Sequence, residues 1–239
     1  MNPDPVRWLA RCGGADAPKV PWALWRHYPE EEYTEPGFAD ATVRFHQGRH
    51  FAFWKIGPRS SYAIRDHGVR DEFRGDVLGR PAYLNRVILE PSDWRRLTVL
   101  DPRAGWQGQV LRSAAVIAAA APPGTPVLMT VFSPMTQAKN LCGAEALADH
   151  WRHARSDLIH GLEILTESTR RFVQALSSLP IHGLFFAIQE CGDPVIGPGY
   201  AEVCGALDAS ILRENAYALN LLHLHGRIAE FDAFTGYPA

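Results

Sequence analysis

Apolar residues in this chain occur in short runs that are separated by longer amphipathic stretches. The most continuous run, Val127 to Phe132, contains only apolar or β-branched residues and predicts a strand buried on both faces, as in a parallel sheet. Four other runs predict strands at residues 20–25, 51–56, 183–189 and 218–224. The sheet is therefore expected to be a central layer.

Helical spacing of apolar residues falls between these runs. It predicts helices over residues 4–12, 37–47, 106–121, 145–154, 157–178 and 200–213, a short helix from Pro91 and a helical turn after Gly226, with an irregular segment at 59–89. Strands that alternate with helices are typical of right-handed βαβ units around a parallel sheet. The pattern fits a doubly wound sheet as well as a barrel.

The segment after the central strand predicts an unusually well-defined strand-to-helix corner. Ser133 supplies a side-chain oxygen that can cap a helix, and Pro134 suits the first helical position because no N–H is needed there. Gly143 suits the position that ends the helix. The free N–H groups of such a helix favour anions beyond the carboxyl end of the strand.

Composition narrows the class of protein. With 239 residues, 46% apolar residues and a net charge of −2, the chain can bury a sizeable core and lacks the charge of a nucleic-acid-binding protein. Its four scattered cysteines fit free thiols in a reducing cytoplasm, and neither a secretory signal nor an apolar run of membrane-spanning length is present. We therefore expect a cytoplasmic protein with a small-molecule substrate, without nucleic-acid or membrane partners.

Polar residues follow all five predicted strands. They are Arg26, His27, Lys55, Ser133, Gln137, Gln189, Glu190, His223 and His225. Because the carboxyl ends of parallel strands meet at one edge of a sheet, this convergence predicts a site there.

Two basic residues in this set can bind anions. The guanidinium of Arg26 matches a carboxylate, although an ion pair with Glu30 or Glu31 would also explain it. Lys55 follows Trp54 in an apolar strand, where a buried ammonium needs an anion, needs water or loses its charge. A ligand carboxylate or phosphate would satisfy it, and so would a structural ion pair with Glu190.

His223 and His225 are two residues apart, so both face the same side of a strand. They suit zinc, with Cys191 or Cys142 as a further ligand, because zinc sites need at least three protein ligands. The alternative is a pair of hydrogen-bonded histidines that line a pocket.

Residues 133–143 belong to a segment, FSPMTQAKNLCG, that resembles a motif of the uroporphyrinogen decarboxylase superfamily. The segments VPWALWRH (20–27), WKIGPRSSYAIRDHG (54–68), LFFAIQ (184–189) and LLHLHG (221–226) resemble further parts of it, in the same order. The resemblance implies a (β/α)8 barrel. This chain, residues 1–239, would be a single domain with roughly five of the eight units, incomplete at its C-terminus. Unpaired strand edges then favour association, as in a homodimer.

The resemblance also suggests roles for residues. It makes Tyr62 and Asp66 site residues, with Lys55, Tyr62 and His223 as catalytic candidates and Arg26 as a carboxylate-binding arginine whose usual second arginine is missing. Lys55 stands near the place of an aspartate that binds pyrrole N–H groups in the decarboxylases. His223 and His225 match the place of a zinc-binding His-x-Cys in the superfamily's methyltransferases.

The leading expectation is a uroporphyrinogen decarboxylase-like lyase of porphyrin biosynthesis that acts on a polycarboxylate such as a tetrapyrrole. This reaction needs no cofactor, since protonation of the pyrrole creates the electron sink. The first alternative is a zinc- or corrinoid-dependent methyltransferase of the same superfamily. The second is a truncated chain that binds a ligand or partner without catalysis.

Overall fold

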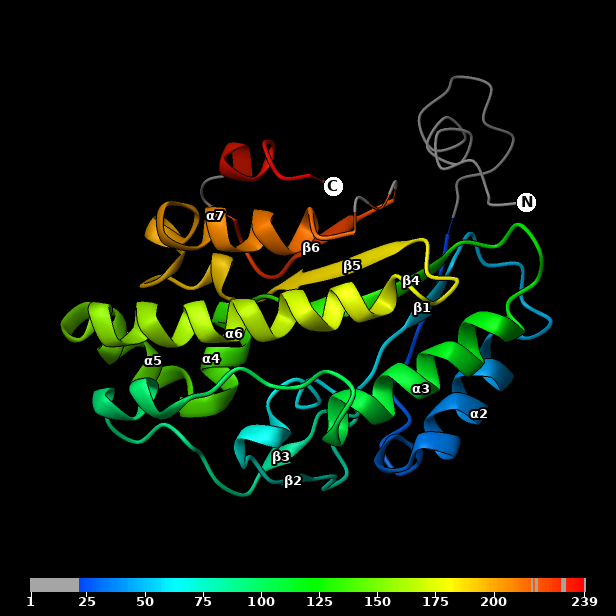
Figure 1. The fold of residues 1–239 in the computed structure, drawn as a ribbon, viewed down its shortest axis with the longest axis horizontal. Helices are drawn as coiled ribbons and strands as arrows, with labels where there is room; N and C mark the ends of the chain where they lie inside the picture. Colours follow the sequence, from blue (N-terminus) through cyan, green and yellow to red (C-terminus); the bar gives the residue numbers. More distant parts are fainter. Residues whose placement is uncertain (1–21, 216, 218, 229–230, 239) are drawn as a thin grey trace.

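The computed structural model describes residues 22–239 except 216, 218, 229, 230 and 239. Its centre is a parallel sheet with the strand order β1-β4-β5-β6 (Figure 1). These strands are β1 (Trp54–Ile56), β4 (Val127–Phe132), β5 (Gly183–Ile188) and β6 (Leu221–Leu224). The chain thus has the mixed α/β character that the alternating pattern predicts, with a four-stranded sheet in its described part.

Helices surround this sheet and fill the crossovers between its strands. They are α2 (Glu35–His46), α3 (Gly105–Ala120), α4 (Pro134–Cys142), α5 (Ala144–His153), α6 (Arg155–Leu176) and α7 (Tyr200–Leu212), with short 3-10 helices at Glu31–Tyr33, Arg65–His67, Pro91–Arg96, Glu190–Gly192, Gly197–Gly199 and Phe231–Phe234. In Figure 1 the long helix α6 runs beside the sheet, with α4 and α5 near one of its ends and the α2–α3 pair toward the other. None of the described helices combines the length and the hydrophobicity that a membrane span requires.

Both faces of the sheet are apolar, but they pack against different partners. Side chains such as Met129, Val131 and Phe186 join the helices in the main core. On the opposite face Phe53, Leu128, Phe185 and Leu219 form a second, smaller cluster. Every residue of β4 and β5 is buried, which explains why these strands read as unbroken apolar runs. The face that carries this smaller cluster is called the inner face of the sheet below.

The corner between β4 and α4 has the predicted structure. The Ser133 hydroxyl accepts a hydrogen bond from the backbone N–H of Thr136 at 3.2 Å, and Pro134 is the first helical residue. The helix ends at Gly143, whose φ of 93° is costly for any other residue. Local sequence therefore determines this element, and the corner places the start of α4 beyond the carboxyl end of β4.

The strands near the N-terminus differ from the prediction. The expected strand at 51–56 is shortened to Trp54–Ile56. Residues 22–25 of the expected strand at 20–25 form no ladder, although the Trp22 carbonyl accepts a hydrogen bond from the Ala52 N–H at 2.9 Å. Residues 20–21 and the expected helix at 4–12 lie outside the described residues.

The irregular segment at 59–89 contains a small antiparallel pair, β2 (Asp71–Glu72) and β3 (Ala82–Tyr83). Asp71 is buried there and accepts hydrogen bonds from Ser61 at 2.6 Å and from Arg65. Strands of two residues carry no periodic pattern, so the sequence could not reveal them. Taken together, the described part of the chain contains a four-stranded parallel sheet flanked by helices and this small antiparallel pair, and its strands do not close into a barrel.

Candidate functional site

Lys55 lies on the inner face of β1 and is almost enclosed. Its side chain reaches between two aromatic rings, with Nζ 4.0 Å from the ring centroid of Trp25 and 4.1 Å from that of Phe185. The residue is only 7% exposed, and this burial lowers the pKa of Lys55 to about 7. Cation–π contacts with both rings partly replace the water that the ammonium has lost.

No carboxylate neutralises Lys55 within the described structure. The alternative in which it pairs with Glu190 is wrong, because Glu190 forms an ion pair with Lys139 at 2.5 Å and accepts a hydrogen bond from Thr136 at 2.6 Å. Thr136 and Lys139, the two partners of the Glu190 carboxylate, both belong to α4. The described structure therefore places no anion next to the Lys55 amine to stabilise its charge. Such perturbed ionisable groups are common in functional sites.

His223 of β6 also packs against Phe185, with ring centroids 5.2 Å apart. Burial lowers the pKa of His223, and the charges of Lys55 and His225 lower it further. At neutral pH its imidazole is therefore uncharged and can accept a proton. His225 is exposed, and its ring centroid is 6.1 Å from that of His223. The structure thus brings Lys55 and His223 together from opposite ends of the sheet.

Thr130 adds a polar group to the same face. It is on β4 two residues after Leu128, which is the register partner of Lys55, so the two side chains point to one side of the sheet. Thr130 is 3% exposed, and its hydroxyl has no hydrogen-bond partner among the residues that the structure describes. Sequence reasoning missed it because a threonine in an apolar, β-branched run looks like an ordinary strand residue.

The two histidines by themselves do not make a zinc site. Among the residues that the structure describes, no three His, Cys, Asp or Glu side chains gather closely enough to hold a metal ion. Cys191 donates its thiol proton to the carbonyls of Ile188 and His225, and burial raises the pKa of its thiol. Burial also raises the pKa of Cys142, to about 12. Both thiols therefore stay protonated, and zinc binding stays a prediction.

Arg26 and His27 line a cavity of about 800 Å³ that borders Trp25. Arg26 is exposed, donates a hydrogen bond to the His27 carbonyl at 3.2 Å and forms no ion pair with Glu30 or Glu31 among the described residues. His27 contacts the buried carboxylate of Glu32 through Nδ1 at 3.1 Å. The guanidinium can therefore bind a ligand carboxylate, although the carboxylates of Glu30, Glu31 and Asp76 line the same cavity. The imidazole of His27 is partly engaged.

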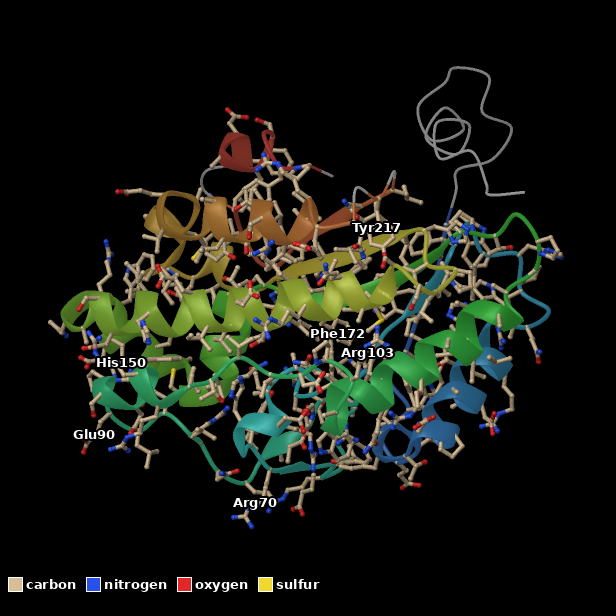
Figure 2. The ribbon with its side chains drawn as sticks, in the orientation of Figure 1. Arg70, Glu90, Arg103, His150, Phe172 and Tyr217 are labelled. Carbon is tan, nitrogen blue, oxygen red and sulfur yellow. The ribbon has the colours of Figure 1, made fainter. Side chains whose placement is uncertain are left out.

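Asp66 and Tyr62 make structural hydrogen bonds. Asp66 accepts hydrogen bonds from the backbone N–H groups of Trp106 and Gln107 at the start of α3. Tyr62 is fully enclosed and donates to the Thr130 carbonyl at 3.1 Å. Its ring packs 5.4 Å from that of Phe172, which Figure 2 labels on α6. Their roles in a site stay predictions, but both have established structural partners.

The predicted site residues around α4 also bind the protein itself. Gln137 donates to the Phe132 carbonyl at 2.9 Å and to the Thr169 hydroxyl at 2.8 Å. Gln189 accepts a hydrogen bond from Lys139 at 2.9 Å. With Ser133 as the helix cap, these side chains join β4, α4, α6 and the end of β5. These hydrogen bonds link α4 to its neighbouring elements, and the residues that form them lie far from Lys55 along the chain.

Asp208 is a further buried acid that was not identified from the sequence. Asp208 of α7 is 0% exposed and accepts hydrogen bonds from the hydroxyls of Tyr200 at 2.9 Å and Tyr237 at 3.2 Å. Burial raises the pKa of Asp208 to about 7. The apolar pattern of α7 does not indicate a buried acid. One of the two hydroxyls that bind Asp208 comes from Tyr237, outside this helix. Asp208 connects α7 to the segment at 231–238.

Comparison with known proteins supports the fold. No protein-family model matches the chain, and no curated protein sequence is significantly similar to it. The structure is similar to that of a methyltransferase from Methanosarcina mazei, with a TM-score of 0.76 and 16% sequence identity. The match covers 95% of this chain and 70% of that chain. At this level of identity the likeness establishes a shared fold.

The expectation of a decarboxylase of porphyrin biosynthesis is wrong. The structural match is to a methyltransferase, and neither a family model nor a curated sequence links the chain to porphyrin metabolism. The chain has the parallel α/β fold of the methyltransferase, with an amine and an imidazole on the inner face of its sheet.

Proposed function

We propose that this chain is a methyltransferase that acts on a small-molecule thiol bound against the inner face of the sheet. The observation that carries the proposal is that Lys55 and His223 both contact the ring of Phe185, inside a fold shared with a methyltransferase. The superfamily resemblance of the sequence supports the same reading. Uroporphyrinogen chemistry has no part in it.

The side chains of the site can activate a thiol at physiological pH. The acceptor must lose its S–H proton, because the thiolate is the nucleophile. The uncharged imidazole of His223 can accept that proton, and the Lys55 ammonium can then stabilise the thiolate. The sulfur takes the methyl group from a methylated donor, whose leaving atom keeps the bonding electron pair. The described residues provide two imidazoles and no third ligand for zinc, so the imidazole of His223 is the base in the proposed reaction.

The test is methyl transfer by the purified chain from methylcobalamin to 2-mercaptoethanol, with the thioether product measured by mass spectrometry. We expect product above the uncatalysed rate and a loss of about 100-fold in His223→Ala, as for removal of a general base. His153→Ala is the matched control, since His153 is an exposed residue of α5 that pairs only with Asp149. Equal rates for wild type and His223→Ala would refute the proposal.

Metal analysis of the same preparations tests the zinc-dependent form of the alternative. Near-stoichiometric zinc that disappears in the His223→Ala, His225→Ala double variant would place a metal at these residues, with further ligands from outside the described structure. A metal-free wild type that still transfers methyl groups would support the base-assisted reaction described above.

A second candidate function is ligand binding without catalysis. It is favoured by the cavity beside Arg26, which is large enough for a small metabolite, and by the structural use of Tyr62, Asp66, Ser133 and Gln137. Isothermal titration with carboxylated thiols such as mercaptoacetate distinguishes the two candidates. Binding that depends on Arg26, together with no product in the methyl-transfer assay, would favour the binding role.

A further inference from the structure

The amine of Lys55 has the environment of a nucleophile. Its described contacts are the faces of two aromatic rings, at 4.0 and 4.1 Å, and no hydrogen bond or ion pair in the described structure holds its charge. Desolvation in an apolar pocket is one of the ways in which proteins activate lysine amines. The proposed methyl transfer uses the charged form of this amine, whereas its uncharged form is a nucleophile in its own right.

The contrast with Lys139 shows that the environment is specific. The chain contains three lysines, Lys19, Lys55 and Lys139. Lys139 forms an ion pair with Glu190 at 2.5 Å and donates a hydrogen bond to Gln189 at 2.9 Å. Lys55 has no such partners, so the same side chain type occupies opposite electrostatic environments in one protein.

We propose that Lys55 captures a small carbonyl compound, an aldehyde or a 2-oxo acid, as an imine. This inference uses the same site as the proposed function but does not depend on methyl transfer. The Nζ lone pair attacks the carbonyl carbon, and the C=O π electrons move to oxygen, which takes a proton to give a carbinolamine. Loss of water then forms the C=N bond, so that both amine protons leave on the departing oxygen.

Neighbouring groups suit each part of this reaction. His223 packs against the same Phe185 ring as the amine, and its uncharged imidazole can carry protons from nitrogen to oxygen. The unpartnered hydroxyl of Thr130 faces the same side of the sheet and can donate to the carbinolamine oxygen. Trp25 borders both the amine and the cavity that Arg26 lines together with Glu30, Glu31 and Asp76. Arg26 is the group in that lining that can pair with the carboxylate of a 2-oxo acid.

The acid–base state of Lys55 supports the inference. With its pKa lowered to about 7, a large share of the Lys55 amine is uncharged at pH 7.5. An ordinary lysine, with a pKa of about 10.4, has roughly one amine in a thousand uncharged at this pH. Since only the uncharged amine attacks a carbonyl, Lys55 should react faster than the other lysines.

Reductive trapping tests the proposal on the full chain. The protein is incubated at pH 7.5 with glyoxylate or with butyraldehyde, each with sodium cyanoborohydride, and the adducts are located by peptide mass spectrometry. We expect one dominant adduct, on Lys55, formed at least about tenfold faster than any adduct on Lys139. Its rate should rise between pH 6 and 8 and then level off.

Two variants remove the amine in different ways. Lys55→Met replaces it with an apolar side chain of similar length and Lys55→Arg keeps a charge, and both should abolish the dominant adduct while retaining a cooperative melt. Lys139→Arg is the matched control and should retain the Lys55 adduct. An unmodified Lys55, or labelling spread evenly over the three lysines and the N-terminus, would overturn the proposal. Trapping at Lys55 without any methyl transfer would leave the inference standing and refute the proposed function instead.

Discussion

At the scale of single residues, Lys55 is the most unusual group that the structure describes. A charged amine in an apolar, aromatic environment costs folding free energy because water solvates it better than two rings do. Its pKa changes from an ordinary value of 10.5 in the unfolded chain to about 7 in the folded one. Between these two values the unfolded chain binds more protons, so the free energy of unfolding rises with pH.

Replacing Lys55 by Met should therefore stabilise the protein at neutral and acid pH. The gain over wild type is expected to be largest below pH 7 and to shrink by at most roughly 1.4 kcal/mol for each pH unit between 7 and 10.5. Urea unfolding of both proteins at pH 6, 8 and 10 measures this difference. Parallel stability curves would show that Lys55 does not change its protonation state on folding.

At the scale of elements, α3 depends on a cap from a distant part of the chain. Its own cap residue, Ala104, has no side chain that could accept a hydrogen bond. The Asp66 carboxylate takes that role for Trp106 and Gln107 at distances of 2.9–3.3 Å. Gly105 is required beside it, since a Cβ at this position would lie 2.2 Å from Asp66 Oδ1.

We expect Asp66→Ala to lower the free energy of unfolding by about 1–2 kcal/mol, as for loss of a helix cap. Thermal denaturation should show a fall of a few degrees in Tm, while carbonyl trapping at Lys55 should continue at the wild-type rate. Asp149→Ala, an exposed acid on α5, should change stability by less than about 0.5 kcal/mol. Unchanged stability with lost ligand binding would instead favour the site role that the superfamily resemblance gives Asp66.

At the scale of the whole molecule, the sheet ends in two edges. In the described structure β6 pairs only with β5, and β1 pairs only with β4. Edge strands with free backbone groups favour pairing with another chain. Part of the β6 edge borders a cavity of about 350 Å³ that Phe231 and Phe234 also line, which leaves apolar surface next to it.

We therefore expect the isolated chain to associate. Sedimentation velocity over a range of micromolar concentrations should show a weight-average mass that increases with concentration, beginning from the 26.5 kDa of one chain. Addition of a short peptide copy of residues 221–224 is not expected to dissociate it, because so short a strand binds weakly. A monomer at every concentration, with one cooperative melting transition, would contradict this expectation.

The sequence by itself determined the local elements of this protein. The apolar run of β4, the Ser133 cap, the Pro134 start and the Gly143 end of α4 all act within a few residues, so their pattern is readable without the fold. The alternation of strands and helices likewise predicted a parallel sheet. These features depend on periodicity and backbone conformation, which neighbouring residues control.

Only the tertiary structure decided the partners of the polar side chains. Glu190 could have paired with Lys55. In the folded chain α4 packs next to the end of β5, so Glu190 forms its ion pair with Lys139. Lys55 instead lies between the rings of Trp25 and Phe185. The resemblance suggested a site role for Asp66, which stays a prediction, and the approach of α3 gives this residue a helix-capping role. Such contacts join residues that lie tens of positions apart, and their energies depend on burial, which local sequence patterns do not specify.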